Sequence, residues 1–190
     1  MMLGNGLRAG LPIGALYWLK ENGKLPAQPA VPLTLSEYVL SALCDGPTEP
    51  QVEPTNAAAY GAFHLANGEW QYEVLEKVGL SDLQWPEIGT VQSVVGQLRV
   101  DGGSLPVYSA VGDHQCALMG AFLQNNELSL NVSTGSQASL ITAELALGDH
   151  ETRPYFDNRY LNTLAKIPAG RALDLLVSLL GELAEIDGHG

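Results

Sequence analysis

The chain has 190 residues, of which 46% are hydrophobic and 16% are charged, and its formal net charge is −12. This composition is typical of a folded chain, and the length allows one sizeable hydrophobic core or two small ones. The acidic balance argues against nucleic acid or an anionic membrane as a partner. No apolar run is long enough to span a membrane, and two cysteines, Cys44 and Cys116, fit a reducing compartment. We therefore expect a cytoplasmic protein, and no Cys or His spacing indicates a metal site.

Two helices are predicted in the first quarter of the chain. Residues 11–19 form the first, and a proline-rich loop over residues 24–32 follows it. Residues 34–43 form the second, because Thr34 and Glu37 have the spacing of a capping box at its start.

The next segment gives mixed signals. Residues 55–65 fit a helix and a strand equally well, and Asn67-Gly68 is a turn signal. Residues 70–78 are predicted to be helical, with Gly79 ending the helix. Residues 91–100 indicate a pair of strands.

Residues 106–142 have the most regular pattern in the chain. They predict a strand over 106–111, a helix over 114–124 with Asp113 at its N-cap, and strands over 128–132 and 137–142. The two last strands are joined by Ser133-Thr134-Gly135-Ser136, a turn rich in hydroxyl groups.

An acid at a helix start and a hydroxyl-rich turn together suggest phosphoryl transfer to an alcohol. Backbone N–H groups and hydroxyls in such a turn can bind phosphate oxygens. The residues alone also fit a simpler interpretation, in which Asp113 is an ordinary N-cap and the turn is a plain hairpin.

The end of the chain is predicted to contain one more helix. Residues 144–153 indicate a polar loop, and residues 160–166 fit a strand or an irregular link. A helix follows over residues 171–186, with a set of apolar positions that includes Leu173, Leu176 and Leu180.

Several of these segments resemble, in the same order, the FGGY family of carbohydrate kinases. The sequences GDHQCALMG at 112–120 and NVSTGSQAS at 131–139 carry the resemblance, and EPTNAA at 53–58 and GAFHLANGEW at 61–70 extend it upstream. The sequence PYFDNR at 154–159 is most similar to that of sedoheptulokinase-like members.

The resemblance implies an α/β chain with part of the actin-like ATPase fold, which is ribonuclease H-like. Residues 1–123 would be the C-terminal part of the first kinase domain, and residues 124–190 the N-terminal part of the second. Because family members are more than twice as long, the chain resembles a central fragment of a kinase.

The resemblance also implies transfer of the γ-phosphoryl group of ATP, with Mg²⁺, to the hydroxyl of a sugar, a ketose such as sedoheptulose. Asp113 would be the catalytic base and contact the sugar, His114 would be a second sugar contact, and Thr134 and Gly135 would bind phosphate. The family's N-terminal phosphate-binding hairpin and its adenosine-binding segment have no match here. We therefore expect the isolated chain to be inactive and to associate with itself or with a complementary kinase half. The alternative is a non-catalytic remnant that acts only as a binding or assembly module.

Overall fold

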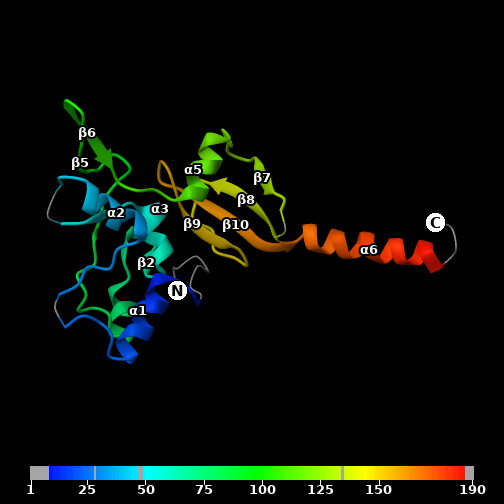
Figure 1. Ribbon diagram of the computed structural model, residues 1–190, viewed down its shortest axis with the longest axis horizontal. Helices are drawn as coiled ribbons and strands as arrows, with labels where there is room; N and C mark the ends of the chain where they lie inside the picture. Colours follow the sequence, from blue (N-terminus) through cyan, green and yellow to red (C-terminus); the bar gives the residue numbers. More distant parts are fainter. Residues whose placement is uncertain (1–8, 28, 47–48, 134, 187–190) are drawn as a thin grey trace.

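The computed structural model of the protein describes residues 9–27, 29–46, 49–133 and 135–186. Its first part consists of helices, loops and very short strands (Figure 1). In chain order these are α1 (Pro12–Glu21), α2 (Leu35–Leu43), β1 (Gln51–Val52), α3 (Pro54–Ala57), the 3₁₀ helix η1 (Ala58–Tyr60), β2 (Phe63–His64), β3 (Glu69–Trp70), α4 (Tyr72–Lys77) and β4 (Glu87–Ile88).

The second part contains the longer strands. β5 (Val94–Val100) and β6 (Gly103–Tyr108) form an antiparallel hairpin, and α5 (Asp113–Gly120) follows. A four-stranded antiparallel sheet then has the order β7-β8-β10-β9. Its strands are β7 (Leu128–Asn131), β8 (Gly135–Thr142), β9 (Glu151–Tyr155) and β10 (Arg159–Pro168), and α6 (Gly170–Ile186) ends the described chain.

The first hydrophobic core is built around aromatic side chains. The Tyr60 ring meets the Trp70 ring edge-on at 5.2 Å between centroids, and the Trp70 and Trp85 rings lie 4.9 Å apart. The indole N–H of Trp70 donates to the carbonyl oxygen of Pro86 at 2.7 Å, so its polar atom is paired inside the core. The other buried hydrophobic members are Ile13, Val52, Ala57, Ala62, Phe63, Leu65, Leu75 and Leu80.

A second, smaller core joins α5 to the four-stranded sheet. Leu118 of α5 packs with Ile141 of β8 and Leu161 of β10, and Ile141 and Leu161 face each other across the two strands. Tyr155 and Phe156, at the end of β9, complete the buried set. Figure 1 shows α5 beside this sheet. The fold thus places the start of α5, and with it Asp113, at the junction of the two cores.

The predicted capping box at the start of α2 is confirmed and extends into a buried polar network. The Thr34 N–H donates to Glu37 Oε2 at 2.9 Å, and the Tyr60 hydroxyl donates to the same oxygen at 3.1 Å. Asn56 Nδ2 also contacts the Glu37 carboxylate. Burial, together with the nearby negative charge of Glu37, raises the pKa of the Tyr60 hydroxyl.

Most of the predicted elements are present, with several corrections. Residues 55–65, which fitted helix and strand equally, contain both. Trp70 lies in β3 rather than in a helix, because Phe63 and Trp70 pair across the Asn67-Gly68 turn. Residues 91–100 contribute one strand, and the partner of that strand is β6. The predicted polar loop at 144–153 includes the start of β9.

Two local features shape β10, one at its start and one near its end. Asp157 and Asn158 have φ angles of 58° and 56°, as the two central residues of a type I′ turn require. Farther along β10, the register to β8 shifts between Leu164 and Ile167, and Lys166 has a φ of 62°. This β-bulge inserts one extra residue just before the chain enters α6.

The last helix, α6, projects away from the rest of the chain (Figure 1). Its predicted apolar positions Leu173, Leu176 and Leu180 are all more than half exposed. A polar stripe of Arg171, Asp174 and Ser178 follows helical spacing on the same element. Among the described residues, no helix combines the length and the hydropathy needed to cross a membrane.

We expect the purified chain to self-associate through α6, because burying exposed leucines between copies removes apolar surface from water. Replacing Leu173, Leu176 and Leu180 together by Gln should lower the average mass measured by static light scattering. The matched control is Ser178→Gln, which changes the polar stripe of the same helix and should leave the mass unchanged. A monodisperse monomer for the unaltered chain would contradict this prediction.

Candidate functional site

A groove of about 610 Å³ lies between the start of α5 and the face of the four-stranded sheet that α5 covers. One row of side chains across this face consists of Ser139, Thr163 and Glu151 on β8, β10 and β9. Asn131 and Gln137 pair across β7 and β8 one step farther along. The sheet face is therefore apolar under Leu118 and polar near Asp113 and His114. The full lining is Asp113, His114, Ala117, Asn131, Gln137, Glu151, Arg153, Thr163 and Ala165.

Asp113 is exposed at the mouth of this groove, as the first residue of α5. Its Oδ1 atom accepts a hydrogen bond of 2.7 Å from the backbone N–H of His114. Unpaired N–H groups at a helix start favour a nearby negative charge. The carboxylate is thus presented to solvent in a fixed orientation.

The structure corrects the predicted start and end of this helix. Gly112, rather than Asp113, is the N-cap residue, with an extended backbone at φ −62° and ψ 131°. Its N–H donates to Thr55 Oγ1 at 2.8 Å, and a Cβ at this position would collide with the side-chain amide of Gln115. The helix ends at Gly120 rather than at residue 124.

His114 is held from the polar end of the sheet. Its Nε2 atom lies 3.0 Å from Ser139 Oγ, which in turn lies 3.1 Å from Thr163 Oγ1. The Gln137 side-chain nitrogen lies 3.4 Å from His114 Nδ1. When Gln137 donates to Nδ1, the neutral ring carries its proton on Nε2 and donates it to Ser139. Burial lowers the pKa of the His114 imidazole, because the charged form loses solvation.

The hydroxyl-rich turn before β8 is organised by short-range hydrogen bonds. The Ser133 hydroxyl donates to the Gly135 carbonyl oxygen at 2.7 Å, and the Ser136 hydroxyl accepts from the Ser133 N–H at 3.2 Å. Gly135 is exposed and starts β8 two residues before Gln137, which lines the groove. Thr134, the other predicted phosphate-binding residue, lies outside the described residues.

Asp113 and His114 are thus brought together in one groove, with Gly135 at the start of a strand that lines it. Sequence reasoning missed the contribution of Arg153 and Glu151, because their segment looked like a polar loop. It also missed Thr163, whose hydroxyl is buried against Ser139. Within the described ranges, no group of three or more His, Cys, Asp or Glu side chains is arranged to hold a metal ion.

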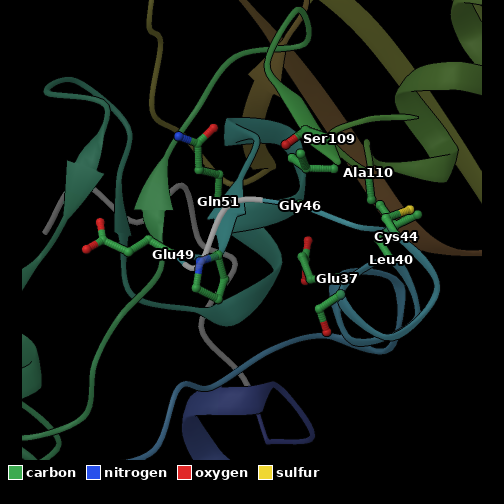
Figure 2. Close-up of a pocket in the computed structure, with 11 residues that line it drawn as sticks. Glu37, Leu40, Cys44, Gly46, Glu49, Gln51, Ser109 and Ala110 are labelled. Carbon is green, nitrogen blue, oxygen red and sulfur yellow. The ribbon is translucent and has the colours of Figure 1, made fainter. Parts of the chain in front are cut away.

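A smaller cavity of about 230 Å³ lies beside α2 (Figure 2). Figure 2 shows Glu37, Cys44, Gln51 and Ser109 among the residues that line it. Ser109 Oγ is buried with no hydrogen-bond partner in the part of the chain that the structure describes. Because none of the predicted site residues lines this cavity, the groove at α5 is the candidate functional site.

Comparison with known proteins shows which proteins this chain is similar to. No family model matches the chain. Mouse sedoheptulokinase is 28% identical over 188 residues, which cover 90% of this chain. Human sedoheptulokinase is 28% identical over 162 residues, or 77% of this chain.

Solved structures agree with these relatives. A xylulose kinase from Bifidobacterium adolescentis superposes with a TM-score of 0.78 over 95% of this chain, at 16% identity. These relatives and solved structures support similarity of the chain to the FGGY family of carbohydrate kinases. The fold of the chain is accordingly part of the actin-like ATPase fold of these kinases. The glycerol kinase of Plasmodium falciparum, solved with ADP, has a TM-score of 0.69 over 87% of this chain, at 17% identity.

The FGGY match extends over only a part of each relative. The chain spans 38% of mouse sedoheptulokinase, 33% of the human protein, 42% of the Bifidobacterium xylulose kinase and 36% of the Plasmodium glycerol kinase. A complete FGGY kinase therefore contains segments that have no counterpart in these 190 residues.

The partly buried imidazole of His114 predicts a pH dependence of stability. Its pKa in the folded chain lies below the ordinary value of 6.5, so the unfolded chain binds more protons as pH falls below that value. The free energy of unfolding should therefore decrease from pH 7.5 to pH 5.5, and His114→Gln should reduce this decrease. Urea unfolding at the two pH values measures it. An unchanged dependence in His114→Gln would count against this prediction.

Proposed function

We propose that the chain is the central part of an ATP-dependent sugar kinase that phosphorylates a hydroxyl group of a ketose. The observation that carries this proposal is the exposed Asp113 carboxylate at the mouth of a polar groove, in a chain similar to the FGGY family. Sedoheptulose is the proposed substrate, because two relatives of that activity match most of the chain. The family similarity favours a kinase over a non-catalytic assembly module.

Asp113 is proposed as the general base. Phosphoryl transfer to an alcohol requires a group that orients the hydroxyl and accepts its proton as the oxygen attacks the γ-phosphorus. The His114 N–H fixes one carboxylate oxygen, Oδ1, and the other oxygen is proposed to take the proton. Because Asp113 is exposed at the start of α5, a sugar in the groove can reach it.

The remaining groove residues are proposed to recognise the sugar. A polyol needs donors and acceptors at several points, and the lining offers the imidazole of His114 and the side-chain amides of Asn131 and Gln137. His114 is the best placed of these, because its hydrogen bonds to Ser139 and Gln137 fix the ring before a ligand binds. Such preorganisation reduces the entropic cost of binding.

Thr134 and Gly135 are proposed to bind the phosphates of ATP. Gly135 is exposed at the end of the β7–β8 hairpin, where backbone groups are accessible to an anion. We propose that Mg²⁺ enters with the nucleotide, held by phosphate oxygens and water. The site would then need no dedicated protein cage for the ion.

We also propose how the chain is divided between two kinase domains. Residues 1–123 would belong to the first kinase domain and residues 124–190 to the second, with α5 at their junction. Leu118 of α5 packs in the second core, and the Gly112 N–H at the start of α5 donates to Thr55 of the first part, which supports α5 as the element at their junction. A cytoplasmic location is proposed with it, in keeping with the free thiols of Cys44 and Cys116.

We expect the isolated chain to show no ATP-dependent sugar phosphorylation, because positioning and charge stabilisation supply nearly all of the catalysis in this reaction. A reconstituted kinase, in which the chain is joined to the segments that its relatives carry on either side, should be active. Its kcat/KM should be highest for sedoheptulose in a panel with xylulose, glycerol and gluconate, measured by ADP release. Activity of the isolated chain, or a preference for glycerol, would contradict the respective part of the proposal.

In the reconstituted kinase, Asp113→Asn should lower kcat by about 100- to 10,000-fold, the usual contribution of a general base, with little change in the KM for ATP. The substitution removes the proton acceptor and keeps the side-chain volume. The matched control is Asp101→Asn in the turn between β5 and β6, which should leave kcat unchanged. A loss below about tenfold would show that Asp113 only supports the helix start.

A further inference from the structure

A short chain of hydrogen bonds connects the first core to the residue that precedes Asp113. It begins at Glu53, the N-cap residue of α3, whose side chain is buried with 4% exposure. Glu53 Oε2 accepts a hydrogen bond of 2.8 Å from the Thr55 N–H and a second one from the Thr55 hydroxyl. Thr55 is itself only 2% exposed.

The donor and acceptor of each hydrogen bond between Gly112, Thr55 and Glu53 can be assigned. A backbone N–H can only donate, so the Gly112 N–H must donate to Thr55 Oγ1 across its 2.8 Å contact. The Thr55 hydroxyl therefore directs its own proton to Glu53. Burial raises the pKa of Glu53, while its hydrogen bonds to Thr55 oppose that shift and favour the carboxylate.

We infer that Glu53 and Thr55 are positioning residues for Asp113, an inference that rests on the proposed function. They hold the peptide N–H of Gly112 and so fix the N-cap from which α5 begins. Asp113 is the next residue, so the position of its carboxylate follows directly from this peptide. Neither positioning residue lines the groove at α5, and both act through Gly112.

The other side of the same peptide is fixed by Gln115. This side chain is buried, donates from Nε2 to the Pro154 carbonyl oxygen at 3.0 Å, and packs where a Cβ on residue 112 would lie. Gly112 is therefore held between Thr55 of the first part and a side chain anchored on β9. With contacts on both sides, removal of one of them should loosen α5 locally rather than unfold the sheet.

This arrangement matters for catalysis because a base must be placed accurately. A misplacement of about 1 Å can cost roughly 100-fold in rate, even when the altered residue is distant from the reacting atoms. Loss of the Thr55 hydroxyl should therefore reduce kcat and leave the KM for ATP nearly unchanged. The nucleotide is proposed to bind at the β7–β8 hairpin and not at α5.

The test on the 190-residue chain is amide hydrogen exchange by NMR. In the wild type, the Gly112 amide should exchange more slowly than amides of exposed loops. In Thr55→Val it should exchange about five- to tenfold faster, as expected for the loss of one intramolecular hydrogen bond, and in Thr55→Ser it should remain protected. Thr152→Val is the matched control, because it removes a hydroxyl from another fully buried threonine and should leave Gly112 unaffected.

Two outcomes of the exchange experiment would overturn the inference. Rapid exchange of Gly112 in the wild type would overturn the inference without any variant. So would equal acceleration of all amides in Thr55→Val, which would reflect global destabilisation only.

In the reconstituted kinase, Thr55→Val should lower kcat at least tenfold, and Thr55→Ser should restore it. If Asp113→Asn has no effect on kcat while Gly112 exchange responds to Thr55→Val, the proposed function fails and the structural link stands. If Asp113→Asn lowers kcat and Thr55→Val does not, the positioning role fails and the base stands.

Discussion

The backbone N–H of Gly112 is the point on which the arrangement of this chain depends. It lies between two hydrophobic cores and donates a hydrogen bond to the hydroxyl oxygen of Thr55, a residue buried in the first part. The helix that begins there contributes Leu118 to the second core. This hydrogen bond therefore links the first core to the start of the helix that presents the Asp113 carboxylate.

The sheet face beneath α5 carries apolar side chains at one end and polar side chains at the other. Toward the end of the helix, Ile141 and Leu161 form an apolar pair that anchors Leu118. Toward its start, the neighbouring pair Ser139 and Thr163 is polar and reaches His114. Because alternate residues of a strand share a face, this change from apolar to polar is set by two positions on each strand. The same surface thus provides both a hydrophobic contact for α5 and a polar groove.

Local signals predicted those parts of the fold in which neighbouring residues decide the structure. The Thr34–Glu37 capping box, the Asn67-Gly68 turn and the long apolar pattern of α6 are of this kind. The start of α5 was misplaced by one residue, because the choice between Gly112 and Asp113 depends on Thr55, which is 57 residues away.

Likewise, the start of β9 was predicted as part of a polar loop, because its own sequence is polar. Only its pairing with β10 makes it a strand. For the site, Asp113 and His114 could be named from the sequence, while Arg153 and Glu151 required the register of β9.

The β-bulge in β10 determines more than a local kink. An extra residue in a strand reverses which face the following side chains occupy, and here the reversal comes just before α6. The left-handed backbone of Lys166, which lies in this bulge, therefore helps to set how α6 is rotated about its own axis. Shortening β10 by one residue would turn the leucine-rich side of α6 toward a different direction while every residue of the helix remained the same. In this chain, a bulge of one residue in the last strand thus affects which direction the leucine-rich side of α6 faces.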